Sequence, residues 1–393
     1  MNTAQTVIRR DNEAAERPAS LVARAKSLAP WLAQRSAQIN QDRMASKEVV
    51  EAFREAGFLS YLRPKMFGGQ EGDYGVFVQV LDELAQGCTS SAWVCSVLGE
   101  HAWFISCFPE QAQIDVWGQD NNACAAASFM PRPVTAVSGG YQVAGTWSFA
   151  SGCDHAQWFL LGGIGQQPMM MLVPASDVQI IDDWNVLGLR GTGSKSVRLR
   201  DAFVPAHRTL AYQDLMAGTS PGAKVHPDYY LCRTPQQLLA PYSLPAVLLG
   251  ATQKALDVFA GSIRDRKLPT GQLIAEQPAM QMAAAEAAAE IDMIRAMIRH
   301  QVRTGVADMR ASRPVDLQKS LDGRRDFTHL AHRMVAVVLK LCAMSGSRWV
   351  FDGDPLQTIL RDVITGSSHR GGSWDGLLGS GRAVFGLPPL STF

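Results

Sequence analysis

The spacing of hydrophobic residues changes twice along this chain, and this change constrains the fold more than any other sequence feature. From about residue 20 to 118, apolar residues recur at intervals of three and four, which predicts amphipathic helices. From about 122 to 205 they alternate or form short runs between turns, as in Gly139–Phe149, which predicts strands. Beyond Gln236 the helical spacing returns. The sequence therefore predicts an α+β fold, mostly α, with a β block between two helical regions.

We expect the domains to follow this order, because a chain of 393 residues has room for two or three domains. The predicted boundaries are an N-terminal helical domain over 1–120, a middle β domain over 121–215 and a C-terminal helical bundle over 216–393. The strongest helical pattern runs from Met280 to Ile298, where Met282, Ala289, Met293 and Ile294 recur at helical spacing in alanine-rich sequence. Small residues let helices approach closely, so we expect this segment to serve in oligomerisation.

The composition argues against several classes of protein. Apolar residues make up 47% of the chain and charged residues 19%, with 37 basic and 36 acidic side chains. Such a near-neutral chain has no charge excess for binding nucleic acid and is too apolar for disorder. The polar N-terminus lacks the apolar stretch of a signal peptide, and no segment reaches ~18 uninterrupted apolar residues. We expect neither secretion nor a membrane span.

Seven cysteines are scattered along the chain and never show CxxC spacing. Their odd number and their spacing argue against a disulfide framework or a structural zinc site. We expect each thiol to be a small buried group in a reduced, cytoplasmic protein. His329 and His332 lie one helical turn apart, but no third ligand is near them in sequence. No metal site is therefore predicted.

The common motifs of nucleotide binding and hydrolysis are absent from the sequence. No G-x-G-x-x-G follows a predicted strand, and no G-x-x-x-x-G-K-[ST], H-E-x-x-H or G-x-S-x-G occurs. Gly188–Ser194 is rich in glycine, but it lies between strands and no helix follows it. We expect that the protein does not itself bind and oxidise NADH.

Three segments, taken in order, resemble the acyl-CoA dehydrogenase superfamily. They are Phe58–Gly69 (FLSYLRPKMFGG), Gly139–Trp158 (GGYQVAGTWSFASGCDHAQW) and Trp184–Pro205 (WNVLGLRGTGSKSVRLRDAFVP). With the helices on either side, the resemblance covers nearly the whole chain. It implies an acyl-CoA dehydrogenase-like fold: an N-terminal helical domain, a middle β-barrel-like domain and a C-terminal helical bundle.

The segments that serve dehydrogenation in that superfamily differ here. A dehydrogenase needs a carboxylate to abstract the α-proton of an acyl thioester. The two places where the superfamily carries it correspond to Ile364–Gly371 and Ser243–Leu256, and neither contains an acid. The flavin-diphosphate motif R-x-x-F-G is degraded to Arg264–Leu268 (RDRKL). An acyl-CoA dehydrogenase is therefore a lesser alternative, and a noncatalytic scaffold of the same fold is a further one.

The chain more closely resembles the flavin-dependent monooxygenase branch of this fold, the oxygenase components of two-component systems. It is similar to 4-hydroxyphenylacetate 3-hydroxylase and to the steroid-phenol hydroxylase. The resemblance implies a homotetramer that receives reduced FMN or FAD by diffusion from a separate NAD(P)H-flavin reductase. With dioxygen it would form a C4a-hydroperoxyflavin and hydroxylate a small aromatic, phenolic substrate. Oxygenation of sulfur or nitrogen, or of indole-type rings, remains an alternative.

Three residues are candidates for catalysis on this resemblance. His101 lies in an apolar helical segment, so it is either a buried core histidine or the group that hydrogen-bonds or deprotonates the phenol. Ser128 would line the same pocket, or it is a strand-end serine. His369 follows a helix in a polar, glycine-containing break, where it would donate to the peroxide or lie exposed in a loop.

Four further residues are expected to contact the flavin on the same resemblance. Ser151 takes the place of the hydroxyl that faces flavin N5 and O4, although a turn-forming serine is the alternative. Phe149 takes the place of the stacking aromatic, or it is a plain core strand residue. Thr192 and Ser194 would contact the flavin phosphate or the dimethylbenzene ring. For His155, in a tight turn, we expect a structural role.

Overall fold

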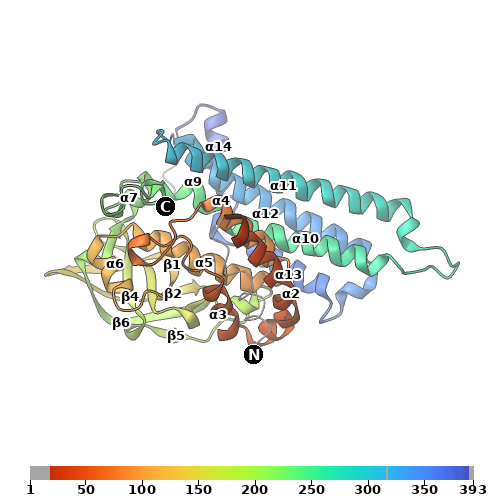
Figure 1. The fold of residues 1–393 in the computed structure, drawn as a ribbon, viewed down its shortest axis with the longest axis horizontal. Helices are drawn as coiled ribbons and strands as arrows, with labels where there is room; N and C mark the ends of the chain where they lie inside the picture. Colours follow the sequence, from red (N-terminus) through yellow and green to blue (C-terminus); the bar gives the residue numbers. More distant parts are fainter. Residues whose placement is uncertain (1–17, 316, 389–393) are drawn as a thin grey trace.

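The computed structural model describes residues 18–315 and 317–388, and in this part of the chain the predicted order of helices, strands and helices is confirmed. Helices surround the upper side and one end of a sheet, and a long helical arm extends away from it (Figure 1). Residues 1–17, to which the prediction of a missing signal peptide refers, lie outside the described residues. The predicted domain boundaries stay a prediction.

The helices that precede the sheet pack into one core. They are α2 (Pro18–Asp42), α3 (Lys47–Glu55), α4 (Tyr74–Ala85), α5 (Thr89–Ser106) and α6 (Glu110–Trp117). The chain leaves α3 through Gly57, whose φ of 81° suits a residue without a side chain. Every residue of α5 except Val97 is buried, so this helix runs through the interior.

The strands form one mixed, seven-stranded sheet in the order β5-β6-β2-β1-β3-β4-β7. They are β1 (Ala125–Val137), β2 (Gly140–Ala150), β3 (Trp158–Ile164), β4 (Pro168–Pro174), β5 (Gln179–Ile181), β6 (Lys195–Pro205) and β7 (Thr209–Ala211). β1 pairs in parallel with β3 and antiparallel with β2, with a register shift between Ser128 and Arg132. The two halves of the sheet enclose a second core around Trp147 and Phe159, which makes the domain barrel-like.

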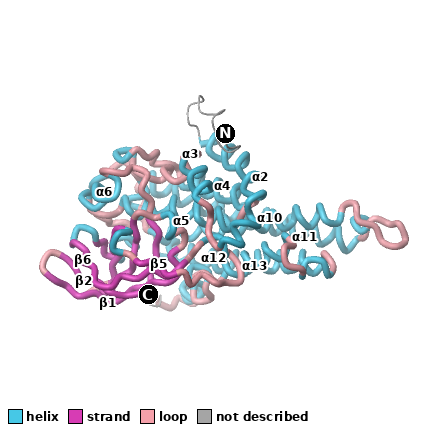
Figure 2. Tube along the Cα trace, turned by 90° about the horizontal axis from the view of Figure 1, so that it is seen from below, coloured by secondary structure: helices cyan, strands magenta, loops and turns pink. Residues whose placement is uncertain are grey.

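Helices return after the sheet, as predicted. The short helices are α7 (Tyr212–Ala217), α8 (Gly222–Val225) and α9 (Gln236–Leu239), and the bundle consists of α10 (Ser243–Ile263), α11 (Pro278–Arg310), α12 (Leu317–Met344), α13 (Pro355–Ser367) and α14 (Gly376–Val384). Helices of this bundle, α11 among them, project well beyond the sheet (Figure 2). The bundle therefore exposes a large helical surface.

The helix predicted from Met280 to Ile298 is confirmed as part of α11, and its Met282 and Met293 do not lie on the packed face. Met282 and Met293 are 62% and 59% exposed, whereas the neighbouring Ala283 and Ile294 are buried. Alanine occurs on all sides of this helix, so the sequence pattern has little contrast between a packed and an exposed face. The methionines thus lie on the outside of the bundle.

Among the described residues, one helix is long and apolar enough to cross a membrane, judged by length and composition alone. Its span is Gln318–Met344 in α12, and half of its most apolar window is buried inside the bundle. A core helix of a bundle passes the same test, so the expected absence of a membrane span stays a prediction.

All seven cysteines are buried, as predicted, and none is in a disulfide. His332 stacks on Trp374 with ring centroids 4.1 Å apart, while His329 is exposed. Within the described residues, no group of three or more His, Cys, Asp or Glu side chains could hold a metal ion.

Candidate active site

One face of α5 runs past the segments that carry the predicted site residues. Trp93, Val97 and His101 follow one another at intervals of four residues, so they share a face over about 12 Å of helix. Val97 lies midway and is the one residue of α5 that is not buried. The Ser151–Gly152 turn packs against Val94 and Leu98, because a Cβ at Gly152 would lie 3.3 Å from the Leu98 side chain. The candidate site is therefore centred on this part of α5.

His101 lies at the C-terminal end of this face and is 4% exposed. Burial lowers the pKa of His101 to about 4, so the imidazole is neutral at pH 7. Its Nδ1 lies 2.7 Å from the carbonyl oxygen of Ala125, which can only accept a hydrogen bond. Nδ1 therefore carries the proton, and Nε2 is left as an acceptor. The rings of Phe104 and Phe129 lie beside it, with centroids 5.7 and 6.0 Å away.

Ser128 does not share this environment, which corrects the expectation that it lines the His101 pocket. Successive side chains of a strand point to opposite faces. Ala127 packs into the helical core on the His101 side, whereas Ser128 pairs in register with Leu161, which belongs to the core inside the sheet. The Ser128 hydroxyl donates to the Ser148 carbonyl oxygen at 2.7 Å. A catalytic role for Ser128 stays a prediction that this position does not support.

Ser151, Ser194 and Thr192 come together in one chain of hydroxyl groups. Ser151 Oγ lies 2.7 Å from Ser194 Oγ, which lies 2.6 Å from Thr192 Oγ1. Thr192 and Ser194 are only 1% and 4% exposed, while Ser151 is half-buried. This burial argues against the direct contact with flavin phosphate or ring expected for Thr192 and Ser194. Of the three residues, only Ser151 is partly exposed.

Phe149 is 64% exposed, which excludes the alternative of a plain core residue. Its φ of 66° lies in the left-handed region, which is uncommon for a residue with a side chain. The ring meets Trp184 edge to face, with centroids 5.9 Å apart. An aromatic side chain held outward in this way is available to stack on a planar ring.

His369 lies at the opposite end of the α5 face from His101. Its ring stacks on Phe327 and meets Trp93 edge to face, each with a centroid distance of 5.8 Å. These apolar neighbours lower the pKa of His369, which favours the neutral ring, although the residue is exposed. The backbone N–H of Gly371 donates to its Nδ1 at 3.1 Å, so Nε2 carries the proton. The two histidines thus hold opposite tautomers: His101 offers an acceptor and His369 a donor.

Asp362 on α13 is a site residue that the sequence reasoning missed. Its Oδ1 accepts the backbone N–H of Leu189 at 2.6 Å, and burial raises its pKa to about 6. Leu189 has a φ of 51°, and its carbonyl oxygen accepts from the Thr192 hydroxyl at 2.8 Å. Asp362 thereby ties the loop of the hydroxyl chain to the helix that leads to His369. An acid at a buried position of an amphipathic helix is the signal that could have indicated it.

Glu100, next to His101, was also missed. It is buried and bonded to the Tyr74 hydroxyl, and burial raises its pKa to about 7. His155 is buried as well, with Nε2 2.8 Å from the Ala45 carbonyl oxygen, which agrees with the structural role expected for it.

The arrangement around α5 suits a flavin ring. Phe149 offers an exposed aromatic face, and Ser151 and the two histidines offer neutral hydrogen-bonding groups. A ring that carries little charge is bound by apolar and neutral polar groups of this kind.

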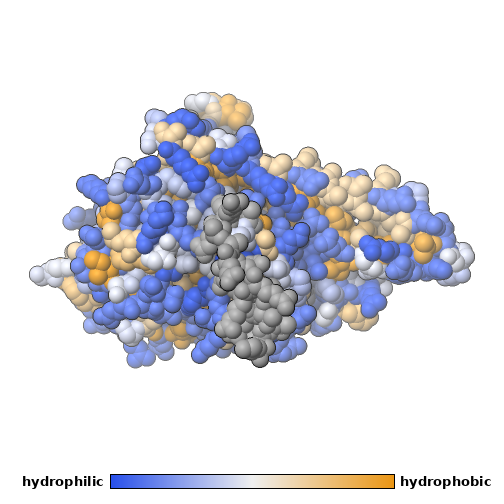
Figure 3. Space-filling view, viewed as in Figure 1, coloured by the Kyte–Doolittle hydropathy of each residue, from blue (hydrophilic) through white to orange (hydrophobic). Residues whose placement is uncertain are grey.

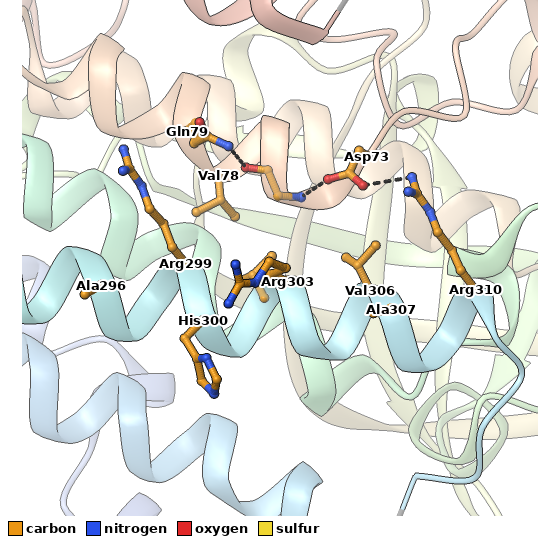
Figure 4. A pocket seen from close by; sticks show the side chains of 12 residues that line it. Asp73, Val78, Gln79, Ala296, Arg299, His300, Arg303, Val306, Ala307 and Arg310 are labelled. Atoms are coloured by element: carbon orange, nitrogen blue, oxygen red, sulfur yellow. Dashed lines mark hydrogen bonds and ion pairs between the residues drawn. The ribbon is translucent and has the colours of Figure 1, made fainter.

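A separate groove of about 600 Å³ lies between α4 and α11 (Figure 4). Arg310 pairs with Asp73 at one end of it, at 2.8 Å, and Arg299 and Arg303 lie along it beside Val78. None of the predicted site residues lines this groove. It is distinct from the candidate active site.

The helical regions match known families directly. The acyl-CoA dehydrogenase N-terminal domain matches residues 23–118, and the acyl-CoA dehydrogenase C-terminal domain matches residues 242–374. Fold and site together thus define a protein of the acyl-CoA dehydrogenase fold class, which confirms the predicted fold.

Whole-chain relatives narrow this class. The oxygenase subunit HsaA of a flavin-dependent monooxygenase from Rhodococcus jostii (strain RHA1) is 32% identical, over 94% of this chain and 99% of that protein. The oxygenase component of the FADH(2)-dependent resorcinol hydroxylase of Rhizobium sp. (strain MTP-10005) is also 32% identical, over 95% and 96%. The crystal structure of the HsaA monooxygenase from M. tuberculosis matches with a TM-score of 0.90 at 30% identity, over 95% and 99%. The chain belongs to this family, the oxygenase components of flavin-dependent monooxygenases, as the resemblance implied.

Proposed function

We propose that this protein hydroxylates a small phenolic substrate with reduced flavin and dioxygen. The observation that carries the proposal is the neutral imidazole of His101, whose Nδ1 is held at 2.7 Å by the Ala125 carbonyl oxygen. Its free Nε2 accepts a hydrogen bond from a phenol O–H. This raises the electron density at the ortho carbon, the position that attacks an electrophilic oxygen.

The other residues of the site would hold the flavin and exclude water. When bound, reduced flavin supplies the electrons that activate dioxygen. Ser151 would hold the flavin near N5, Phe149 would hold its ring, and the Nε2–H of His369 would be the hydrogen-bond donor on the side where oxygen binds. Phe104 and Phe129 keep water away from His101.

Phenols are favoured over sulfur substrates by the tautomer of His101. A thioether or thiophene sulfur has no proton to donate to Nε2, so the acceptor would remain unpaired in an apolar setting. The resorcinol hydroxylase among the relatives is named for a phenolic substrate, in line with this choice. The test supplies reduced FMN and dioxygen together with a panel of monophenols and dibenzothiophene. Catechol formation supports the proposal, and oxidation of dibenzothiophene alone overturns it.

The proposed function also includes a source of reduced flavin and a cellular location for the protein. A separate NAD(P)H-flavin reductase delivers reduced FMN or FAD by diffusion, because relatives are oxygenase components of larger systems. The seven buried free thiols suit a reducing cytoplasm, which we propose as the location.

A homotetramer is the assembly that we propose for this chain. A band of apolar residues follows α11 on the projecting arm (Figure 3), where Met282 and Met293 are 62% and 59% exposed. A large exposed apolar surface favours association with another copy. Light scattering at micromolar concentration should report four chains, and a monomer would refute this assembly.

A further inference from the structure

The chain of hydroxyl groups has a direction that is fixed at its inner end. Thr192 Oγ1 lies 2.8 Å from the carbonyl oxygen of Leu189, which can only accept, so the Thr192 proton is committed there. Ser194 Oγ lies 2.6 Å from Thr192 Oγ1. Because Thr192 has no second proton, Ser194 must be the donor in this bond.

The same reasoning applies to the outer bond. Ser151 Oγ lies 2.7 Å from Ser194 Oγ, whose proton is already used, so Ser151 must donate inward. Ser194 and Thr192 are almost fully buried, which excludes water as an alternative partner. Ser151 is therefore left with lone pairs alone on its open side. Successive hydrogen bonds polarise one another, which makes Ser151 a stronger acceptor.

We propose that Thr192 and Ser194 are positioning residues that make Ser151 an acceptor and thereby select reduced over oxidised flavin. This inference rests on the proposed function, in which Ser151 faces flavin N5. N5 of reduced flavin carries a hydrogen and donates, whereas N5 of oxidised flavin has only a lone pair. An acceptor at Ser151 therefore binds the N5–H of reduced flavin and repels the lone pair on N5 of oxidised flavin.

The anchor of this chain is held from another part of the fold. Asp362 Oδ1 accepts the N–H of Leu189 at 2.6 Å, which helps to hold Leu189 at its φ of 51°. Gly188 lies so close to α13 that an added Cβ would be 2.1 Å from the Arg361 carbonyl oxygen. Residues of α13 thus hold in place the Leu189 carbonyl group, which sets the direction of the hydrogen bonds from Ser151 through Ser194 to Thr192.

The test compares Thr192→Val with Thr192→Ser in equilibrium titrations with reduced FMN, under anaerobic conditions, and with oxidised FMN; FAD is titrated in the same way. Valine keeps the shape of threonine without the hydroxyl, so Ser194 loses its acceptor and can donate to Ser151. We expect the ratio of the Kd for oxidised flavin to the Kd for reduced flavin to fall roughly tenfold, the size of one hydrogen bond. Thr192→Ser keeps the hydroxyl and should keep the ratio.

Ser196→Ala is the matched control, because its hydroxyl lies on β6 and bonds Ser148 Oγ at 3.1 Å, outside the chain of three. It should leave the ratio unchanged. An unchanged ratio in Thr192→Val, with the melting temperature of the wild type, overturns the inference. A wild-type protein that does not prefer reduced flavin also overturns the inference, whereas a wild-type protein that prefers reduced flavin but forms no catechol overturns the proposed function instead. If Thr192→Val does not fold, Ser194→Ala replaces it, since it frees the Ser151 proton and should lower the ratio equally.

Discussion

Glu100 and His101 are neighbours on α5, and burial shifts their pKa values in opposite directions. The pKa of Glu100 rises from 4.5 to about 7, and that of His101 falls from 6.5 to about 4. The two residues are 7% and 4% exposed. One pKa unit corresponds to about 1.4 kcal/mol, so each shift is worth about 3 kcal/mol of folding free energy.

The two contributions have opposite signs. Between pH 4.5 and about 7 the folded protein keeps the Glu100 proton that the unfolded chain has lost, so stability falls as the pH rises. Between pH 6.5 and about 4 the unfolded chain binds a proton on His101 that the folded protein does not, so stability falls as the pH drops. In the wild type the two slopes cancel between about pH 4.5 and 6.5.

Removing either group should expose the slope of the other. Relative to the wild type, Glu100→Gln should gain about 3 kcal/mol in free energy of unfolding from pH 4.5 to 7, and His101→Ala should lose as much from pH 4 to 6.5. Urea denaturation at intervals of one pH unit measures both, with the exposed Glu110→Gln as the control. A difference between Glu100→Gln and the wild type that does not change with pH would refute the reasoning, because Glu100 would then not be a buried neutral acid.

Three further predictions concern the chemistry. At pH 7, His101→Ala should lower product formation by ~10²–10⁴ while reduced flavin is still oxidised by dioxygen, as followed by stopped-flow spectra and product analysis; a normal hydroxylation rate would end the catalytic claim. His369→Ala should bind reduced flavin but divert oxygen to hydrogen peroxide, because the Nε2–H donor is lost, and a peroxide assay measures this; unchanged coupling would remove His369 from the site. The purified protein should be nearly colourless and should not oxidise NADH, and stoichiometric bound FAD with NADH oxidation would contradict this.

Local sequence patterns were enough to predict the fold. They did not predict the surroundings of individual side chains. The order of helices and strands follows from hydrophobic spacing, which depends only on residues that are close together in the sequence. The pattern did not indicate which face of α11 is packed, because alanine occurs on every side of that helix. The sequence did not indicate on which face of the sheet Ser128 lies, because a shift of one residue in a strand moves a side chain to the opposite face.

The sequence, through its hydrophobic spacing and the family resemblance of its motifs, determined the fold class, the missing dehydrogenase carboxylate and the two candidate histidines, because these depend on residue type and order along the chain. Only the tertiary structure decided which proton each histidine carries, since the partners are backbone groups: the Ala125 carbonyl oxygen for His101 and the Gly371 N–H for His369. It also decided the role of Asp362, which bonds Leu189 across 173 positions of the chain. A hydrogen bond between such distant residues leaves no local pattern, because folding alone brings the two groups together.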